Sequence, residues 1–208
     1  MSGYQIDSRK IEPGNLFFAL KGERSDGHKH LRDAVSKGAV GAVVSKGYQG
    51  PDFGLILIPV EDVVSSLQEL ARYFMRECRS KVIGITGSVG KTTTKEFLAT
   101  LLSGKYKIAK TYLNYNTKLT YPITLLNREG DEDVLVVELG MTEPGDIGRL
   151  VNIAAPNIAI VTKIAFVHAA NFQGELSEIA KYKTEIFSDP KTSVCIFCLL
   201  YTSDAADE

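Results

Sequence analysis

The sequence has little cysteine, no excess of charge of either sign and no long hydrophobic run, and each absence excludes a class of protein. Three cysteines among 208 residues fit a reducing compartment. The 24 basic residues nearly balance the 25 acidic ones, which argues against a surface built to bind nucleic acid. No apolar stretch is long enough to span a membrane, and no charged-then-apolar leader follows Met1. The sequence therefore predicts a cytoplasmic protein with no membrane insertion.

The composition that remains is that of an ordinary globular protein, with 44% hydrophobic and 24% charged residues. The length allows one large or two small domains. Cys195 and Cys198 form a single Cys-x-x-Cys pair without a second pair. We therefore interpret them as strand residues and not as zinc ligands or a redox pair.

The most informative stretch is residues 82–96, where an apolar run breaks into glycines and then becomes helix-forming. It predicts a buried strand, a phosphate loop and a helix that begins at Lys91. Glycines allow consecutive backbone N–H groups to face one point, and a helix N-terminus adds partial positive charge there, which suits a polyphosphate. The predicted nucleotide-binding residues are Gly87, Ser88, Val89, Gly90, Lys91, Thr92 and Thr93.

In such a loop Lys91 would reach the β and γ phosphates of ATP, and the hydroxyl of Thr92 would bind the accompanying magnesium ion, Mg²⁺. The strict pattern has glycine where this chain has Ile85, so the match consists of Gly-Lys-Thr and Gly87. A glycine-rich turn that binds nothing is the alternative. The strand before the loop and the helix after it favour the phosphate loop.

The sequence divides near this loop into two α/β segments, which we expect to be separate domains of residues 1–80 and 81–197. The predicted strands of the first segment are 16–20, 39–44 and 55–60, and its predicted helices are 30–37 and 63–75. The predicted strands of the second are 82–85, 107–109, 134–139, 158–161 and 194–197, and its predicted helices are 91–102, 121–126 and 176–187. This alternation predicts a doubly wound, mainly parallel sheet with ligands at the carboxyl ends of its strands.

Polar residues follow the predicted strands of the second segment. Glu138 interrupts an apolar run at a strand end, where its carboxylate could face a magnesium ion near Thr92 or could simply be solvated. A histidine such as His168, in the loop after a strand, is more often structural than a ligand. By composition alone, Lys183 belongs to the solvent face of its helix.

These motifs together resemble the Mur ligase family. Residues 86–96 are similar to the nucleotide loop of that family, which also lacks the first glycine of the usual phosphate loop. Residues 7–9, 13–24 and 26–28 resemble its UDP-binding amino-terminal domain, and residues 138–141, 144–147, 168 and 180–187 resemble its central domain.

The resemblance implies an ATP-dependent amide-bond ligase of peptidoglycan precursor synthesis, in which a carboxylate is phosphorylated and an amine attacks the acyl phosphate. The Thr-Lys-Glu sequence that ends at Glu96 favours the member that joins D-alanyl-D-alanine to UDP-N-acetylmuramoyl-tripeptide. The member that adds the third amino acid to the UDP-muramoyl dipeptide remains an alternative. So does a phosphate-loop nucleotide-binding module without ligase activity. We expect a monomer.

The resemblance also assigns roles to residues. Lys91 would clamp the β and γ phosphates, and Thr92 and Glu138 would hold one magnesium ion. His168 would serve a second magnesium ion. Lys183 matches the lysine that the family carbamylates and would become an anionic group near that ion.

Substrate contacts are implied in both segments. Ser8 and Arg9 would contact the UDP-sugar, and Asn114 and Asn116 would touch the carboxylate and phosphate region of the substrate, although they could be ordinary turn residues. Leu113 stands where the family usually has glycine. Other positions that depart from the family pattern are Thr117, Thr120, Lys163, Ala165 and Ala170.

The end of the chain departs from the family as well. We expect a truncated central domain that ends near residue 197, followed by a non-native tail at 198–208. Such a fragment would bind UDP-sugar weakly and nucleotide poorly, and it would not turn over.

Overall fold

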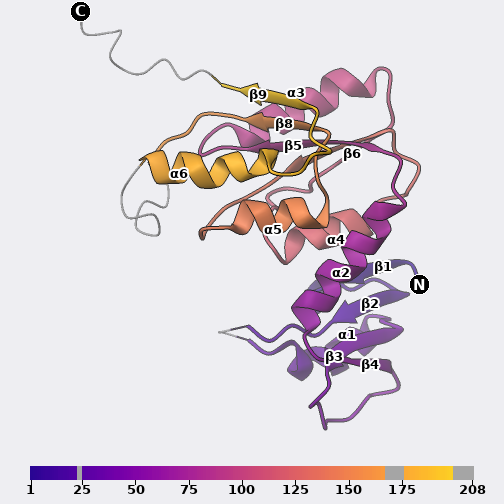
Figure 1. Cartoon of the computed structure of the whole chain (residues 1–208). Coiled ribbons are helices and arrows are strands. Elements are labelled where there is room, and N and C mark those ends of the chain that lie inside the picture. The colour runs from indigo at the N-terminus through magenta and orange to yellow at the C-terminus, as the bar shows by residue number, and fades with distance from the viewer. Residues whose placement is uncertain (23–24, 167–175, 199–208) are drawn as a thin grey trace, which may run out of the picture. The chain divides into compact units, whose positions relative to one another are not determined.

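The computed structural model describes residues 1–22, 25–166 and 176–198. The chain separates into two compact units, Met1–Arg76 with Leu125–Asn127 and Glu77–Thr124 with Arg128–Glu208. Each unit contains one parallel β-sheet with helices packed on it (Figure 1). The predicted α/β class with parallel sheets is confirmed. Within the described ranges, no helix combines the length and the apolar character needed to cross a membrane.

The first unit has four strands in the sheet order β1-β2-β3-β4, and every neighbouring pair is parallel. The strands are β1 (Gly3–Gln5), β2 (Asn15–Phe18), β3 (Gly41–Ser45) and β4 (Ile56–Val60). The helices are η1 (Ser8–Lys10), η2 (Gly27–His30), α1 (Leu31–Ser36) and α2 (Val63–Arg76), η denoting a 3-10 turn. In α2 the buried residues recur every four positions, at Val63, Leu67, Ala71 and Met75, as the apolar face of a helix requires.

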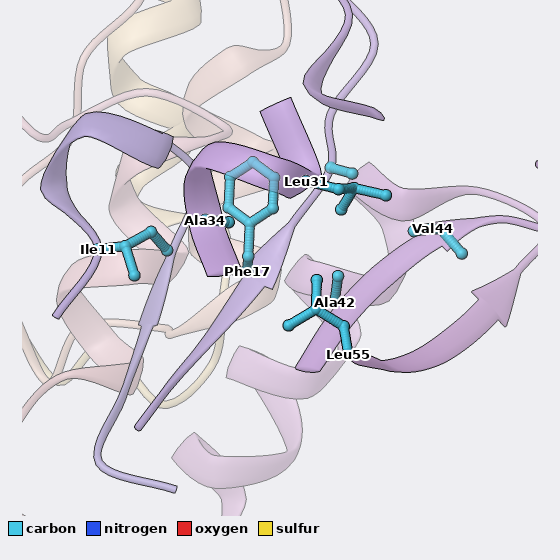
Figure 2. Close-up of a cluster of buried hydrophobic side chains, with 8 residues drawn as sticks. Ile11, Phe17, Leu31, Ala34, Ala42, Val44 and Leu55 are labelled. Carbon is cyan, nitrogen blue, oxygen red and sulfur yellow. The ribbon is translucent and has the colours of Figure 1, made fainter. Parts of the chain in front are cut away.

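The core of the first unit contains side chains from its strands and from α1. Figure 2 shows Phe17 of β2 pointing toward Ala34 and Leu31 of α1. The buried cluster consists of Ile11, Phe17, Ala19, Leu31, Ala34, Ala42, Val44 and Leu55. Strand alternation places Phe18 on the opposite face, where its ring centroid lies 6.5 Å from that of Tyr4.

The second unit has five strands in the order β6-β7-β5-β8-β9, again with every pair parallel. The strands are β5 (Lys81–Thr86), β6 (Ile108–Lys110), β7 (Val134–Glu138), β8 (Ile158–Val161) and β9 (Val194–Phe197). The helices are α3 (Lys91–Ser103), α4 (Thr120–Leu126), α5 (Asp146–Ile153), α6 (Leu176–Lys183) and the 3-10 turn η4 (Thr184–Phe187). The last two residues of α4 belong to the first unit.

Helices cover both faces of this sheet, as in a doubly wound fold. On one face Ile83 and Ile85 of β5 pack against Leu98 and Leu102 of α3. Figure 1 shows α5 and α6 on the other side. There the side chain of Ile186 approaches within 3.4 Å of the position that a Cβ at Gly84 would take, so a larger residue would crowd this interface.

Strand β5 lies at the centre of the sheet, between β7 and β8. The chain visits β6 and β7 on one side of β5 before it crosses to β8 on the other, which makes the carboxyl end of β5 a topological switch point. The register places Ile85 opposite Glu138, and Thr86 opposite Val161. The phosphate loop, Glu138 and the segment after β8 therefore meet at one edge of the sheet.

Candidate nucleotide-binding site

The phosphate loop connects β5 to α3, and two of its glycines have backbone conformations that favour glycine. Gly87 has a φ of +144°, and Gly90, the residue before α3, has a φ of +94°. The N–H groups of Ser88 and Val89 both donate to the carbonyl oxygen of Lys163, at 2.8 and 3.2 Å. The segment that follows β8 thereby fixes the shape of the loop.

The side chain of Thr162 is a second anchor for this loop. Its Oγ1 lies 2.7 Å from the carbonyl oxygen of Val89 and 3.1 Å from that of Thr86, within donor distance of both. A Cβ at Gly87 would lie 1.9 Å from the same Oγ1. Glycine is therefore required at 87 for its φ and for the space beside Thr162.

Two ammonium groups converge on the loop. Nζ of Lys91, in the first turn of α3, and Nζ of Lys183, at the end of α6, donate to the carbonyl oxygen of Gly87, at 2.8 and 3.1 Å. Burial, and secondly the charge of Lys91, lower the pKa of Lys183 to about 8. Burial also lowers the pKa of Lys91, and the carboxylate of Glu138 opposes that shift. Two neighbouring cations at a helix N-terminus create a site that attracts anions.

The burial of Lys183 decides one question that the sequence left open. Lys183 is only 5% exposed, so the interpretation of this residue as part of the solvent face of its helix is wrong. Its neighbour Lys181 is exposed, as expected for that face.

Glu138 ends β7 with a buried side chain whose two oxygens differ in their surroundings. Oε2 lies 3.4 Å from Nδ2 of Asn116. Oε1 makes an ion pair with Nζ of Lys95 at 3.2 Å but has no hydrogen bond within the described part of the chain. A buried carboxylate oxygen with an unused lone pair suits Mg²⁺, which binds proteins through one or two carboxylates together with substrate phosphates.

Thr92, the other predicted magnesium ligand of the loop, is exposed in the first turn of α3. Among residues 1–22, 25–166 and 176–198 there is no group of three or more His, Cys, Asp or Glu side chains placed to hold a metal ion. Mg²⁺ is usually bound through one or two carboxylates together with substrate phosphates, and the carboxylate of Glu138 beside the phosphate loop is a donor of that kind.

A cavity of about 370 Å³ lies beside this edge of the sheet. Lys91, Asn116, Gly140 and Asp146 are among the residues that line it. The N–H group of Gly140 donates to the carbonyl oxygen of Asn116 at 2.8 Å, which fixes Asn116 between the cavity and Glu138. Asn114 is exposed and does not belong to the lining.

The first unit contains a separate cavity of about 540 Å³. In its wall the ring of His28 stacks on that of Tyr48, with centroids 5.3 Å apart. Nε2 of His28 accepts the N–H group of Ser45 at 3.0 Å, so Nδ1 of the neutral ring carries the proton that is donated to Asp26 at 2.6 Å. Lys29 adds a cation to the lining.

The other predicted residues lie apart from these two cavities. Ser8 is buried in η1, and Arg9 is exposed and forms an ion pair with Asp7 at 2.8 Å. Neither lines the cavity that contains His28. The prediction for His168 falls outside the described residues.

Two residues of the site were missed in the sequence. Lys95 was used only to recognise the Thr-Lys-Glu motif and was given no role of its own. Its position one helical turn after Lys91 indicates that both side chains lie on the same side of α3. Thr162 gave no signal, because nothing in the sequence shows that the end of β8 touches the phosphate loop.

We predict that Lys91→Met lowers the affinity of this chain for ADP by ~10- to 100-fold, since the charge-assisted hydrogen bonds of an ammonium to phosphate are lost. Isothermal titration calorimetry measures the affinity. Lys105→Met, in the exposed segment after α3, is the matched control and should bind as the unchanged chain does. Equal affinity of the Lys91→Met and Lys105→Met variants would show that Lys91 does not contact phosphate.

The parallel sheet, the loop at its switch point and the paired lysines define a phosphate-loop α/β protein. A model described as the Mur ligase middle domain matches residues 85–205, and one described as the Mur ligase family catalytic domain matches residues 1–75. The chain belongs to the Mur ligase family.

Its relatives include UDP-N-acetylmuramoyl-tripeptide–D-alanyl-D-alanine ligase of Rickettsia prowazekii, which is 40% identical over 89% of this chain and 40% of its own length. The MurF ligase of Thermotoga maritima, solved in complex with ADP, is similar with a TM-score of 0.81 and 32% identity over 98% of this chain and 46% of its own. MurF of Acinetobacter baumannii is similar with a TM-score of 0.85 and 32% identity over 97% of this chain and 44% of its own. The chain spans about two fifths of the length of the curated relatives it matches.

Proposed function

We propose that this chain carries the UDP-sugar-binding and ATP-binding parts of a ligase that joins D-alanyl-D-alanine to UDP-N-acetylmuramoyl-tripeptide. The observation that carries the proposal is the convergence of Lys91 and Lys183 on the carbonyl oxygen of Gly87, beside buried Glu138. A module that only binds nucleotide needs the loop and Lys91, whereas a second buried lysine of lowered pKa can be carbamylated and then serve a metal ion during phosphoryl transfer.

In the proposed reaction the γ-phosphoryl group of ATP is transferred to the terminal carboxylate of the tripeptide, which gives ADP and an acyl phosphate. The dipeptide amine then attacks the acyl carbon, phosphate leaves with the bonding electrons, and the amine loses a proton. Lys91 neutralises the phosphate oxygens during transfer, and Asn116 orients the carboxylate from the cavity wall. These residues supply positioning and charge and form no covalent bond with the substrate.

Thr92 and Glu138 would hold the magnesium ion of the nucleotide, with His168 and Lys183 serving a second ion. Bound magnesium would neutralise charge on the phosphate oxygens. The lowered pKa of Lys183 leaves more of its amine neutral, and a neutral amine can add carbon dioxide with release of a proton. The resulting carbamate would replace a like-charge contact with Lys91 by an attractive one.

We assign residues 1–80 to UDP-sugar binding, through Ser8, Arg9 and the cavity of His28, and residues 81–197 to nucleotide binding. The stacked ring of His28 and the cation of Lys29 provide apolar and charged surfaces of the kind that a nucleoside diphosphate requires. We further infer that the protein is a cytoplasmic monomer.

The test is equilibrium binding of UDP-N-acetylmuramoyl-tripeptide to this chain by calorimetry, with UDP-N-acetylmuramoyl-dipeptide as the competitor. We expect the tripeptide compound to bind more tightly, and His28→Ala to weaken it by ~10-fold through loss of the ring that supports Tyr48 in the cavity wall, while ADP affinity is unchanged. Arg9→Ala tests the predicted UDP contact, and exposed His30→Ala is the matched control.

Three results would contradict this proposal in different ways. Tighter binding of the dipeptide compound would favour the ligase that adds the third amino acid. No binding of either compound would favour a nucleotide-binding module without ligase activity. Unchanged binding by both the His28→Ala and Arg9→Ala variants would show that the UDP group binds elsewhere.

A further inference from the structure

Lys95 is a buried cation that the proposed reaction does not use. Its side chain is 1% exposed, and its Nζ donates to the carbonyl oxygens of Thr111 at 2.8 Å and Leu113 at 3.1 Å. The same Nζ lies 3.2 Å from Oε1 of Glu138 and 3.3 Å from Oε1 of Glu96. A buried ammonium must have its hydrogens and its charge satisfied, and these partners satisfy both. Lys95 thus ties the phosphate-loop helix to β7 and to the segment after β6.

That segment has an unfavourable backbone conformation which Lys95 stabilises. Leu113 has a φ of +46°, in the left-handed region that leucine rarely adopts, and its carbonyl oxygen accepts one of the Lys95 hydrogen bonds. Three residues later Asn116 places Nδ2 at 3.4 Å from Oε2 of Glu138. Lys95 therefore contacts one oxygen of the Glu138 carboxylate directly and supports the segment that contacts the other.

The geometry of the Lys95 contact leaves Glu138 able to bind a cation. Oε1 makes an ion pair with Lys95 but no hydrogen bond in the described chain, so its lone pairs keep their acceptor capacity. Thr111 adds to the support, because its Oγ1 accepts the N–H group of Glu138 at 2.9 Å. Residues that orient a metal ligand without contacting the metal commonly set the affinity of the site.

We propose that Lys95 is a positioning residue that holds the Glu138 carboxylate for the divalent cation of the bound nucleotide. The inference rests on the proposed function in taking the phosphate loop as the nucleotide site and Glu138 as a ligand of the cation that the nucleotide brings. An ion pair that serves stability alone would affect the binding of all ligands to a similar degree. A positioning residue affects the part of nucleotide affinity that depends on the metal.

The test is titration of the non-hydrolysable analogue AMP-PNP into this chain, once with Mg²⁺ and once with EDTA. Lys95→Met should reduce the gain in affinity on adding Mg²⁺ by ~10-fold or more and leave the affinity in EDTA unchanged. The matched control is Lys110→Met, which removes an exposed lysine that also pairs with Glu96 and should keep the full gain.

Two outcomes would overturn the proposal. One is an undiminished gain on adding Mg²⁺ for Lys95→Met, which includes an equal loss of affinity with and without Mg²⁺. The other is the absence of any gain in the unchanged chain. Neither of them concerns UDP-muramoyl peptides, so failure of this inference and failure of the proposed ligase function are distinguishable.

Lys95→Met alone could fail to fold, because the substitution leaves the buried charge of Glu138 without its partner. A second comparison keeps the test decisive in that case. The double variant Lys95→Met with Glu138→Gln removes both charges. Glu138→Gln alone should abolish the gain on adding Mg²⁺, and the double variant should lose nothing further, since Lys95 acts through Glu138. Additional loss in the double variant would show that Lys95 acts independently and would overturn the proposal.

Discussion

Gly87→Ala is expected to abolish measurable ADP binding and to lower the free energy of unfolding of the second unit by about 3 kcal/mol or more. Two causes add. Alanine at a φ of +144° is strained, and its Cβ would lie 1.9 Å from Oγ1 of Thr162. Relief of that overlap must break the contacts of Thr162 with the carbonyl oxygens of Val89 and Thr86, on which the loop shape depends. Urea unfolding and calorimetric titration with ADP measure the two effects.

The matched control for this substitution is Gly130→Ala. Gly130 also has a positive φ, +98°, but a Cβ there would have no atom within 4 Å. Only the conformational cost then applies, about 1 kcal/mol, and ADP affinity should be unchanged. If the two variants unfold at the same urea concentration, the contact with Thr162 does not constrain the loop.

The second large effect is a dependence of stability on alkaline pH that is due to Lys183. Its pKa falls from the ordinary 10.5 to about 8 in the folded chain. Between these values the unfolded state holds the proton more tightly than the folded state, so stability rises as pH increases from about 8 to about 10.5. A shift of this size corresponds to about 3 kcal/mol over the whole interval. Below pH 8 both states are protonated, and the cost of burying the charge is fully present.

Lys183→Met should remove this rise. We therefore expect the unfolding free energy of the unchanged chain to increase relative to that of the variant as the pH is raised from about 8 to about 10.5. Urea unfolding at a series of pH values measures it, and the titrations of groups that do not interact with Lys183 cancel in the difference. Lys181→Met, at an exposed position of the same helix, is the control and should keep the rise. Parallel curves for Lys183→Met and the unchanged chain would contradict the assigned cause.

The parts of the fold that could be predicted are those with strong periodicity. The repeat of buried residues in α2 identifies a helix because one face is buried, and the continuous apolar run of β7 identifies a strand that is buried on both faces. Strand β1 has three residues, too few for any period. Helix α5 follows Gly145 at a φ of +80° and contains Gly148, so its local propensity is poor and its formation depends on the burial of Leu150 and other apolar residues.

The candidate site divides in the same way. Lys91 and Glu138 could be predicted, because a loop motif and a polar residue at a strand end are local signals. The convergence of Lys183 on Gly87 could not, since the two are 96 positions apart and only the packing of α6 brings them together. The resemblance to a family assigned a role to Lys183 but gave no physical reason for it. Its burial beside Lys91 provides one.

The contacts of the phosphate loop with Thr162 and Lys163 also have a kinetic consequence. These hydrogen bonds lie entirely within the protein, so the conformational entropy of the loop is lost when the chain folds and not when a ligand arrives. Capture of a nucleotide then requires no ordering of the loop backbone, only an exchange in which the N–H groups of Ser88 and Val89 leave the carbonyl oxygen of Lys163 for phosphate. Discrimination between one nucleotide and another will reside in how long each stays bound.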